Sequence, residues 1–300
     1  MFLKSVTILF CIICHSLHAG VSEWVTMTLE NGHMKFPVLV EGIETMAIVD
    51  SGAQINGLNE SFKRKHNLDF AEGRPIKLVG VHGKENRPTY NGVSVEMFGL
   101  KTKLNSLGSI NFGGDNSALV LGAGFLQNYI VQIDYPNEKM RFVTRDSMKL
   151  HDFVNVRVKS QKDTGRPIIK VNLNNQTDVW LLLDTGATSG VFLERSVASK
   201  NGWLDKYPVV SSKSQGALSH GATDTFSLPT FKIGPYELEN VTVDVGSEGS
   251  ITNVGSQVDT SFSRIKGTTV RGLLGYDVLK HFILTLDYKR GQAHLGLPPN

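Results

Sequence analysis

The feature that most constrains the fold of this chain is an internal repeat. The stretch from Glu23 to Val143 is echoed, in order and in spacing, from Asn155 to Leu295. In each half an apolar run leads into an aspartate and a glycine-containing turn, Asp50-Ser51-Gly52-Ala53 in the first half and Asp184-Thr185-Gly186-Ala187 in the second. A short apolar run that ends at turn residues is typical of a buried strand. The repeat therefore predicts two similar lobes, each with an aspartate at the end of a strand.

The repeat continues beyond the aspartates. Each half has a second apolar run that ends in glycine, Gly122 or Gly275, and an Asp-Tyr pair follows at the same interval in both halves. This spacing predicts a short helix and then a final hairpin in each half. Helical spacing also predicts helices at 58–68 and 193–203, and alternating apolar residues predict strands at 24–29 and 154–158.

The two halves differ mainly in their middle sections, because the second half has more residues between its aspartate and its second glycine. We assign the extra residues to 246–267, whose Gly, Ser and Thr content predicts a long loop. The charged stretch 144–152 is predicted to connect the halves. We therefore expect an all-β protein with an N-terminal lobe at 20–147 and a C-terminal lobe at 148–300.

Paired aspartates in equivalent turns suggest a specific chemistry. A single Asp-Ser/Thr-Gly sequence is weak evidence for catalysis, because the aspartate could merely cap its own turn. Two lobes related by a two-fold axis, however, bring equivalent turns face to face. Two carboxyl groups in such close contact share one proton and titrate as a unit. The ionised member can then take a proton from water while the protonated member donates to a peptide carbonyl, without a metal or cofactor.

Together these motifs resemble the retropepsin-like aspartic peptidases, the established case of two aspartates that share a proton. The resemblance covers nearly the whole chain after residue 19, and two lobes in one chain resemble single-chain bacterial members and, more distantly, pepsin. It implies two β-barrel lobes with short helices and an active site between them, in which Asp50 and Asp184 are catalytic.

The resemblance also implies roles for residues around the two aspartates. Ser51 and Thr185 would brace the turns against each other, and Gly52 and Gly186 would lie under the carboxyl groups. The complete set implied for the turns and their supporting loops is Ser51, Gly52, Ala53, Thr185, Gly186, Ala187, Gly122 and Gly275.

Members of this family cover the cleft with flexible hairpins called flaps. A glycine-containing segment follows each predicted helix, and the candidate flap glycines are Gly80 and Gly83 in the first lobe and Gly216 and Gly221 in the second. Glycine is equally common at the tips of ordinary hairpins, so a structural interpretation of these four residues stands beside the functional one.

Residues 1–19 predict export. Lys4 precedes an apolar run from Val6 to Cys14, and a polar stretch then ends at Ala19, which is typical of a cleaved signal peptide. The run is shorter than the roughly 20 residues that span a bilayer. Because both cysteines lie in this segment, the mature protein would have none, which favours a bacterial periplasm over eukaryotic secretion. We expect a periplasmic or secreted protein without a stable membrane anchor.

Several other functions are disfavoured. The formal net charge is only +3, and the charges are scattered, which argues against a nucleic-acid partner. The histidines show no metal-binding spacing, so no metal is expected. We predict an aspartic endopeptidase that acts on polypeptides as a monomer without a cofactor. The alternative is an inactive module of the same fold that binds peptides in the periplasm.

Overall fold

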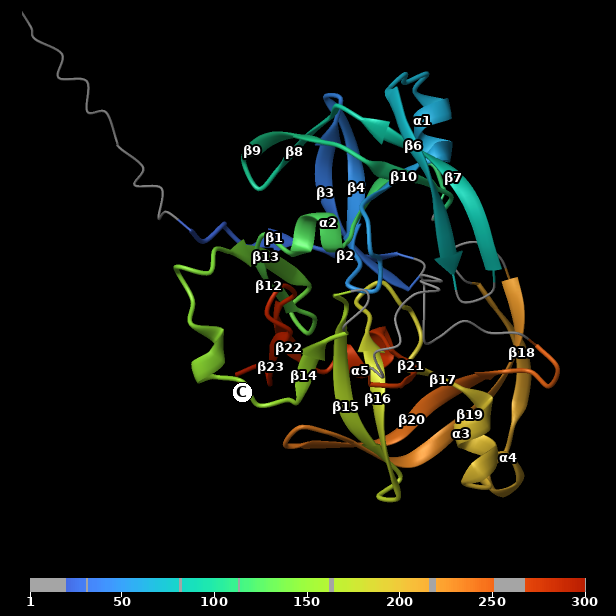
Figure 1. Cartoon of the computed structure of the whole chain (residues 1–300). Helices are drawn as coiled ribbons and strands as arrows, with labels where there is room; N and C mark the ends of the chain where they lie inside the picture. Colours follow the sequence, from blue (N-terminus) through green and yellow to red (C-terminus); the bar gives the residue numbers. More distant parts are fainter. Residues whose placement is uncertain are drawn as a thin grey trace, which may run out of the picture.

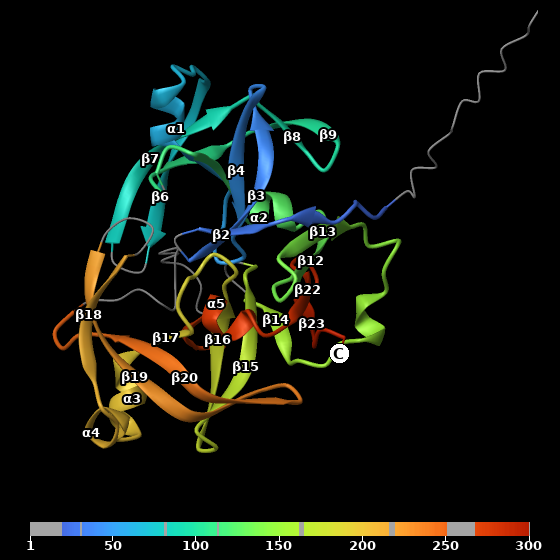
Figure 2. The same cartoon turned by 180° about the vertical axis from the view of Figure 1, so that it is seen from behind.

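The computed structural model describes residues 20–30, 32–80, 83–112, 114–161, 165–215, 220–250 and 268–299. Two β lobes lie one above the other in Figure 1, and a smaller sheet lies between them. Figure 2 shows the same arrangement from behind. The predicted all-β fold with two lobes and few short helices is confirmed. None of the helices in the described part of the chain is long and apolar enough to span a membrane.

The N-terminal lobe is built on one ten-stranded sheet. Its strands are β2 (Thr28–Glu30), β3 (His33–Val40), β4 (Ile43–Val49), β5 (Gly57–Asn59), β6 (Ala71–Gly80), β7 (Gly83–Asn91), β8 (Val93–Met97), β9 (Leu100–Leu104), β10 (Leu107–Ile110) and β11 (Ser117–Leu121). Two short helices accompany it, α1 (Glu60–Lys65) and α2 (Ala123–Leu126).

The C-terminal lobe has an eight-stranded sheet, and an additional pairing between β15 and β19 links strands from different parts of that sheet. Its strands are β14 (Val158–Ser160), β15 (Pro167–Leu173), β16 (Thr177–Leu183), β17 (Val191–Leu193), β18 (Val210–Gln215), β19 (His220–Ile233), β20 (Tyr236–Gly246) and β21 (Val270–Leu274). Its helices are α3 (Arg195–Lys200), α4 (Trp203–Lys206) and α5 (Tyr276–Leu279).

The same strand pairings surround both aspartates. In the N-terminal lobe β4 runs parallel to β11, and β5 pairs antiparallel with β11 and parallel with β10. In the C-terminal lobe β16, β21, β17 and β20 are paired in the same way. As a result, the backbone N–H of Asp50 donates to Leu121 O at 3.0 Å, and that of Asp184 donates to Leu274 O at 2.9 Å.

A five-stranded sheet joins the lobes. It contains β1 (Val25–Thr26), β13 (Lys139–Val143), β12 (Ile130–Asp134), β22 (Ile283–Asp287) and β23 (Gln292–Gly296), in that order. The predicted final hairpins are therefore confirmed as β12–β13 and β22–β23, and they pair with each other through β12 and β22. At the centre of this pairing Gln132 lies opposite Thr285, and its Nε2 donates to Thr285 Oγ1 at 3.0 Å.

The connection between the lobes is anchored to this sheet. It contains a short 3-10 helix, η1 (Leu150–Asp152), and Arg145 near its start. The Arg145 guanidinium binds both carboxylate oxygens of Asp287, with Nη2 at 2.8 Å from Oδ1. Asp287 is fully buried, so this ion pair neutralises a charge that would otherwise be costly inside the fold.

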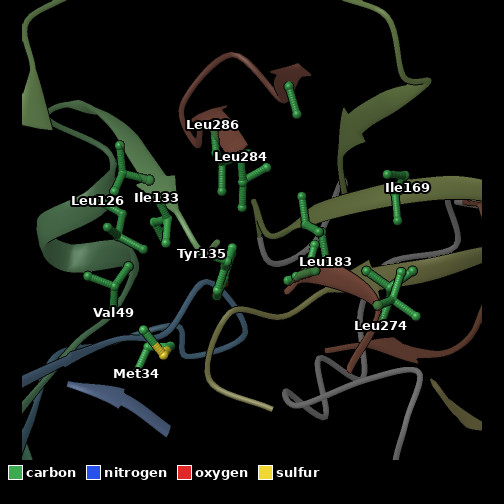
Figure 3. Close-up of a cluster of buried hydrophobic side chains, with 14 of the residues drawn as sticks. Met34, Val49, Leu126, Ile133, Tyr135, Ile169, Leu183, Leu274, Leu284 and Leu286 are labelled. Carbon is green, nitrogen blue, oxygen red and sulfur yellow. The ribbon is translucent and has the colours of Figure 1, made fainter. Parts of the chain in front are cut away.

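One hydrophobic core runs through both lobes and the sheet that joins them. Figure 3 shows Tyr135 in the middle of this cluster, with Val49 on one side and Leu183 on the other. Val49 and Leu183 are the residues immediately before the two aspartates. Apolar packing therefore holds both aspartate-bearing strands against the sheet that joins the lobes.

Some local predictions need correction. The predicted strand at 154–158 is wrong except for its last residue, because the Asn155 side chain bonds instead to the backbone of Leu295 in β23. The predicted helix at 58–68 is shorter and starts at Glu60, since Asn59 belongs to β5 and caps the helix through Ser61 N. The predicted helix at 193–203 is likewise split into a strand end, α3 and the start of α4. The predicted strand at 24–29 is broken at Met27.

The short helices after Gly122 and Gly275 are confirmed as α2 and α5. Of the predicted long loop at 246–267, Gly246 is the last residue of β20, and residues 251–267 lie outside the described residues. The predicted signal peptide at 1–19 also lies outside them.

Candidate active site

Two carboxyl groups meet between the lobes. Asp50 follows β4 and Asp184 follows β16, and their side chains are hydrogen-bonded to each other. We call this pair the dyad. Asp50 Oδ1 accepts hydrogen bonds from the N–H groups of Gly52 and Ala53, both at 2.8 Å. Asp184 Oδ1 accepts one from Gly186 N at 3.0 Å. Each turn therefore orients its own carboxyl group.

The two turns are also bound to each other by an exchange of hydroxyl groups. Ser51 Oγ donates to Leu183 O at 2.6 Å and accepts from Thr185 N at 3.0 Å. In return, Thr185 Oγ1 donates to Val49 O at 2.7 Å and accepts from Ser51 N at 3.0 Å. Each hydroxyl uses its donor and one acceptor site across the lobe boundary, which fixes the distance between the turns.

The glycines of the turns lie directly against the opposite carboxyl group. A β-carbon added to Gly52 would lie 2.4 Å from Asp184 Oδ2, and one added to Gly186 would lie 2.4 Å from Asp50 Cγ. Real side chains do not approach that closely, so only glycine leaves room for the dyad.

The supporting glycines pack against the same turns. A β-carbon on Gly122 would lie 2.7 Å from Ala53 O, and one on Gly275 would lie 2.7 Å from Ala187 O. These two carbonyls accept hydrogen bonds from the residue after each glycine, Ala123 N and Tyr276 N, both at 2.9 Å. The structure thus brings the supporting loops into contact with both turns.

Burial raises the pKa of both carboxyl groups of the dyad. For Asp50, the hydrogen bonds from Ala53 N, Asp184 and Gly52 N counteract part of this increase. The pKa of Asp184 is raised well above its usual range, because burial is reinforced by the negative charge of Asp50. Asp184 is only 9% exposed, whereas Asp50 is partly exposed.

Four polar residues near the dyad were missed by the sequence analysis. His33 and Arg166 are close enough to respond to its charge, and so are Tyr135 and Tyr288. Burial raises the pKa of both tyrosines, so they are neutral near the dyad. The repeated Asp-Tyr pairs were a signal for the tyrosines. No motif marked His33 or Arg166.

The candidate flaps are hairpins. Strands β6 and β7 pair up to Gly80 opposite Gly83, and β18 and β19 pair up to Gln215 opposite His220. Gly221 lies opposite Ser214, and Gly216 lies outside the described residues. In both views the two hairpins lie on the same side of the molecule, β6–β7 pointing down from the N-terminal lobe and β18 pointing up (Figure 1, Figure 2).

Other candidate sites lie away from the dyad. A surface hollow of about 620 Å³ is lined by residues of β3, β4 and β8, including Pro37, Met46 and Met97, and includes neither aspartate. Within the described ranges, no three His, Cys, Asp or Glu side chains are grouped so that they could hold a metal ion.

The two-lobed fold and the carboxyl pair between the lobes are the features that the resemblance to aspartic peptidases implies. Residues 169–278 match the family model of aspartyl proteases, a segment that contains Asp184, its turn and Gly275. This match confirms the resemblance to aspartic peptidases predicted from the sequence, and it supports aspartic protease activity in general terms. No curated protein matches the chain.

Proposed function

We propose that this protein is an exported aspartic endopeptidase that hydrolyses extended polypeptide segments between its lobes. The observation that carries the proposal is the dyad itself: two hydrogen-bonded carboxyl groups, on turns that exchange hydroxyl bonds across the lobe boundary. Such a pair shares one proton, so it contains a general base and a general acid in contact.

The surroundings of the two carboxyl groups support different roles for them. Asp50 Oδ1 accepts two backbone N–H bonds and Asp184 Oδ1 accepts one, and such bonds favour the ionised form. Asp184 is also the less exposed of the two. We therefore assign the negative charge to Asp50 and the shared proton to Asp184 before reaction.

The reaction follows from this assignment. Asp50 takes a proton from a water molecule as the water oxygen attacks the peptide carbonyl carbon, and Asp184 donates its proton to the carbonyl oxygen. The resulting tetrahedral diol collapses when one hydroxyl returns its proton to Asp184. The proton on Asp50 passes to the amide nitrogen, and the C–N bond breaks to give a carboxylic acid and an amine. The dyad ends with one proton, as it began.

The decisive experiment is to compare D50N and D184N with the wild type on an unfolded protein substrate such as casein. Each variant keeps the shape of the side chain but removes its ionisation, so we expect cleavage to fall at least about 1,000-fold with the fold retained. D115N is the matched control, because Asp115 is an exposed partner of Lys65 and should leave activity unchanged. Cleavage retained in either dyad variant would rule out the mechanism.

The same experiment separates the two candidate functions. If the wild type binds casein peptides but produces no cleavage at any pH, the inactive peptide-binding module is the better description. Product formation that both dyad variants abolish excludes it.

We also propose that the protein is exported to the periplasm, with cleavage after Ala19, and that one chain forms the complete site. The signal-like residues 1–19 support export, and the presence of both aspartates in one chain supports a monomer. N-terminal sequencing of the mature protein should begin at Gly20. Light scattering should give the mass of one chain, and a dimer mass would contradict this proposal.

A further inference from the structure

Two basic residues occupy the same position in the two lobes. Strand register establishes this equivalence: Lys35 lies opposite Ile48, and Ile168 lies opposite Leu182. Ile48 lies two residues before Asp50, and Leu182 lies two residues before Asp184. His33 lies two residues before Lys35, and Arg166 lies two residues before Ile168. His33 and Arg166 therefore occupy equivalent positions in the two lobes.

His33 connects the N-terminal lobe to the opposite turn. It is hydrogen-bonded to the backbone of Gly186, whose own N–H orients Asp184. The preceding residue, Gly32, packs so closely on Thr188 that an added β-carbon would lie 2.9 Å from that side chain. His33 is half-buried at the dyad, and the charge of Asp50 acts directly on its ring.

The other charged group that acts on His33 is Lys35, on the same strand. Lys35 is fully buried, and its Nζ lies 3.1 Å from Glu30 Oε2. Burial lowers the pKa of the His33 imidazole, while the charge of Asp50 and the bond to Gly186 act in the opposite direction. The ring is therefore neutral at neutral pH and gains a proton as the solution becomes acidic.

Arg166 is a permanent charge at the equivalent position of the C-terminal lobe. It is only 1% exposed, and its Nη2 donates to Gln161 Oε1 at 3.1 Å. A guanidinium does not lose its proton in a protein, so its buried charge requires a nearby negative charge. The charges of Asp184, Tyr288 and Asp50 act on Arg166, and that of Asp184 acts most strongly of the three.

We propose that Arg166 and His33 are the counter-charges of the dyad, Arg166 at every pH and His33 when it is protonated, and that they hold the dyad in its singly ionised form. The proposal rests on the proposed function, since it concerns the same site. Neither residue is placed against the reacting atoms. They act through Asp50, Asp184 and the Gly186 backbone, and so are positioning residues.

The two residues should have different effects on titration. A nearby positive charge favours ionised carboxyl groups, so it lowers the pH of both steps, from the neutral dyad to one charge and from one charge to two. Arg166 is charged throughout and should lower both steps. His33 is charged only in acid and should lower the first step alone.

The test is a ¹³C NMR titration of aspartate carboxyl groups in the full mature chain, with the dyad signals identified by their loss in D50N and D184N. In R166M both steps should move to higher pH by about one unit or more. In H33Q, which keeps a donor for Gly186, only the acid step should move upward. R157Q is the control, because Arg157 is exposed and its loss removes the same charge from the surface of the C-terminal lobe.

Two results would overturn the proposal: dyad titrations in H33Q and R166M that coincide with those of the wild type and R157Q, or an R166K variant that titrates differently from the wild type. If R166M does not fold, H33Q and R166K still decide the question. The titration needs no substrate. A shift in these variants alongside a wild type that cleaves nothing would contradict the proposed function and leave this inference intact.

Discussion

Ser51 and Thr185 each donate a hydroxyl hydrogen bond to the carbonyl group that precedes the opposite aspartate-bearing turn, at 2.6 Å to Leu183 O and 2.7 Å to Val49 O. Each hydroxyl also accepts the backbone N–H of the other residue, at 3.0 Å. Four hydrogen bonds thus join the lobes immediately below the dyad, so the stability of this boundary and the geometry of the site depend on the same two side chains.

The first prediction concerns these hydroxyl groups. Thr185→Val keeps the shape but leaves Val49 O and the Ser51 N–H without their partner, which should lower the free energy of unfolding by about 1–3 kcal/mol. Protease activity should fall as well, because the turns lose their fixed separation. Urea unfolding and casein cleavage provide the measurements. Thr185→Ser retains the hydroxyl and should stay close to the wild type; a Val variant as stable and active as the Ser variant would contradict the prediction.

A second prediction concerns the space under the dyad. Gly52→Ala and Gly186→Ala each place a β-carbon 2.4 Å from an atom of the opposite carboxyl group, so the dyad must separate. We expect cleavage to fall by about 100-fold or more, as is common when reacting groups move by an ångström. Gly296→Ala is the matched control, because its nearest neighbour would lie at an ordinary 3.5 Å. Equal kcat values for the three variants would show that the glycines are not required for the dyad.

A third prediction compares a buried and a surface ion pair. Arg145→Met removes the nearer cation of the Asp287 carboxylate, which is 0% exposed, and leaves it only the longer 3.8 Å contact with Arg290, so we expect a loss of about 3 kcal/mol. Arg271→Met breaks a pair of the same 2.8 Å length with Glu194, but at the surface, and should cost less than about 1 kcal/mol. Thermal and urea unfolding of the two variants test this difference, and similar losses would refute it.

The fourth prediction follows from the raised pKa values of Asp50 and Asp184. Above the usual pKa of an aspartate, the native dyad holds protons that the unfolded chain has released, so stability contributed by this pair declines as pH rises towards its folded pKa values. D184N removes the part of this dependence that comes from Asp184. Relative to the wild type it should gain stability between about pH 4 and about pH 7, the interval in which an unfolded aspartate is ionised. Urea unfolding at both pH values measures the difference, and a constant difference would argue against a raised pKa.

Much of the fold was accessible from the sequence because the repeat preserves spacing. The constant interval from Gly122 to Asp134 and from Gly275 to Asp287 was sufficient to predict a short helix and a final hairpin in each half, and both are present. The placement of Asp50 and Asp184 at the ends of corresponding strands likewise followed from apolar runs that end at glycine-containing turns.

The remaining features depend on contacts that the sequence does not display. The alternation of apolar residues at 154–158 is typical of a strand, but this segment contacts β23 through the side chain of Asn155 and not through backbone pairing. The hairpin before Asp50 turns through Glu41 and Gly42, whereas the hairpin before Asp184 has a turn one residue longer, Asn174 to Gln176. His33 and Arg166 therefore do not lie the same number of residues before their aspartates, which hides their equivalence in the sequence. Counting back from the aspartates therefore pairs the wrong residues. Only strand register corrects the count.

The hydrogen bond between Gln132 and Thr285, at the centre of the sheet that joins the lobes, distinguishes this chain from an assembly of identical subunits. In a symmetric homodimer, the residue at such a central position lies opposite its own copy. Here unlike residues meet, so one can be the donor and the other the acceptor. Covalent linkage of the lobes frees each half to diverge, and the same freedom allows a histidine in one lobe and an arginine at the equivalent position of the other to contribute different charges to one shared dyad.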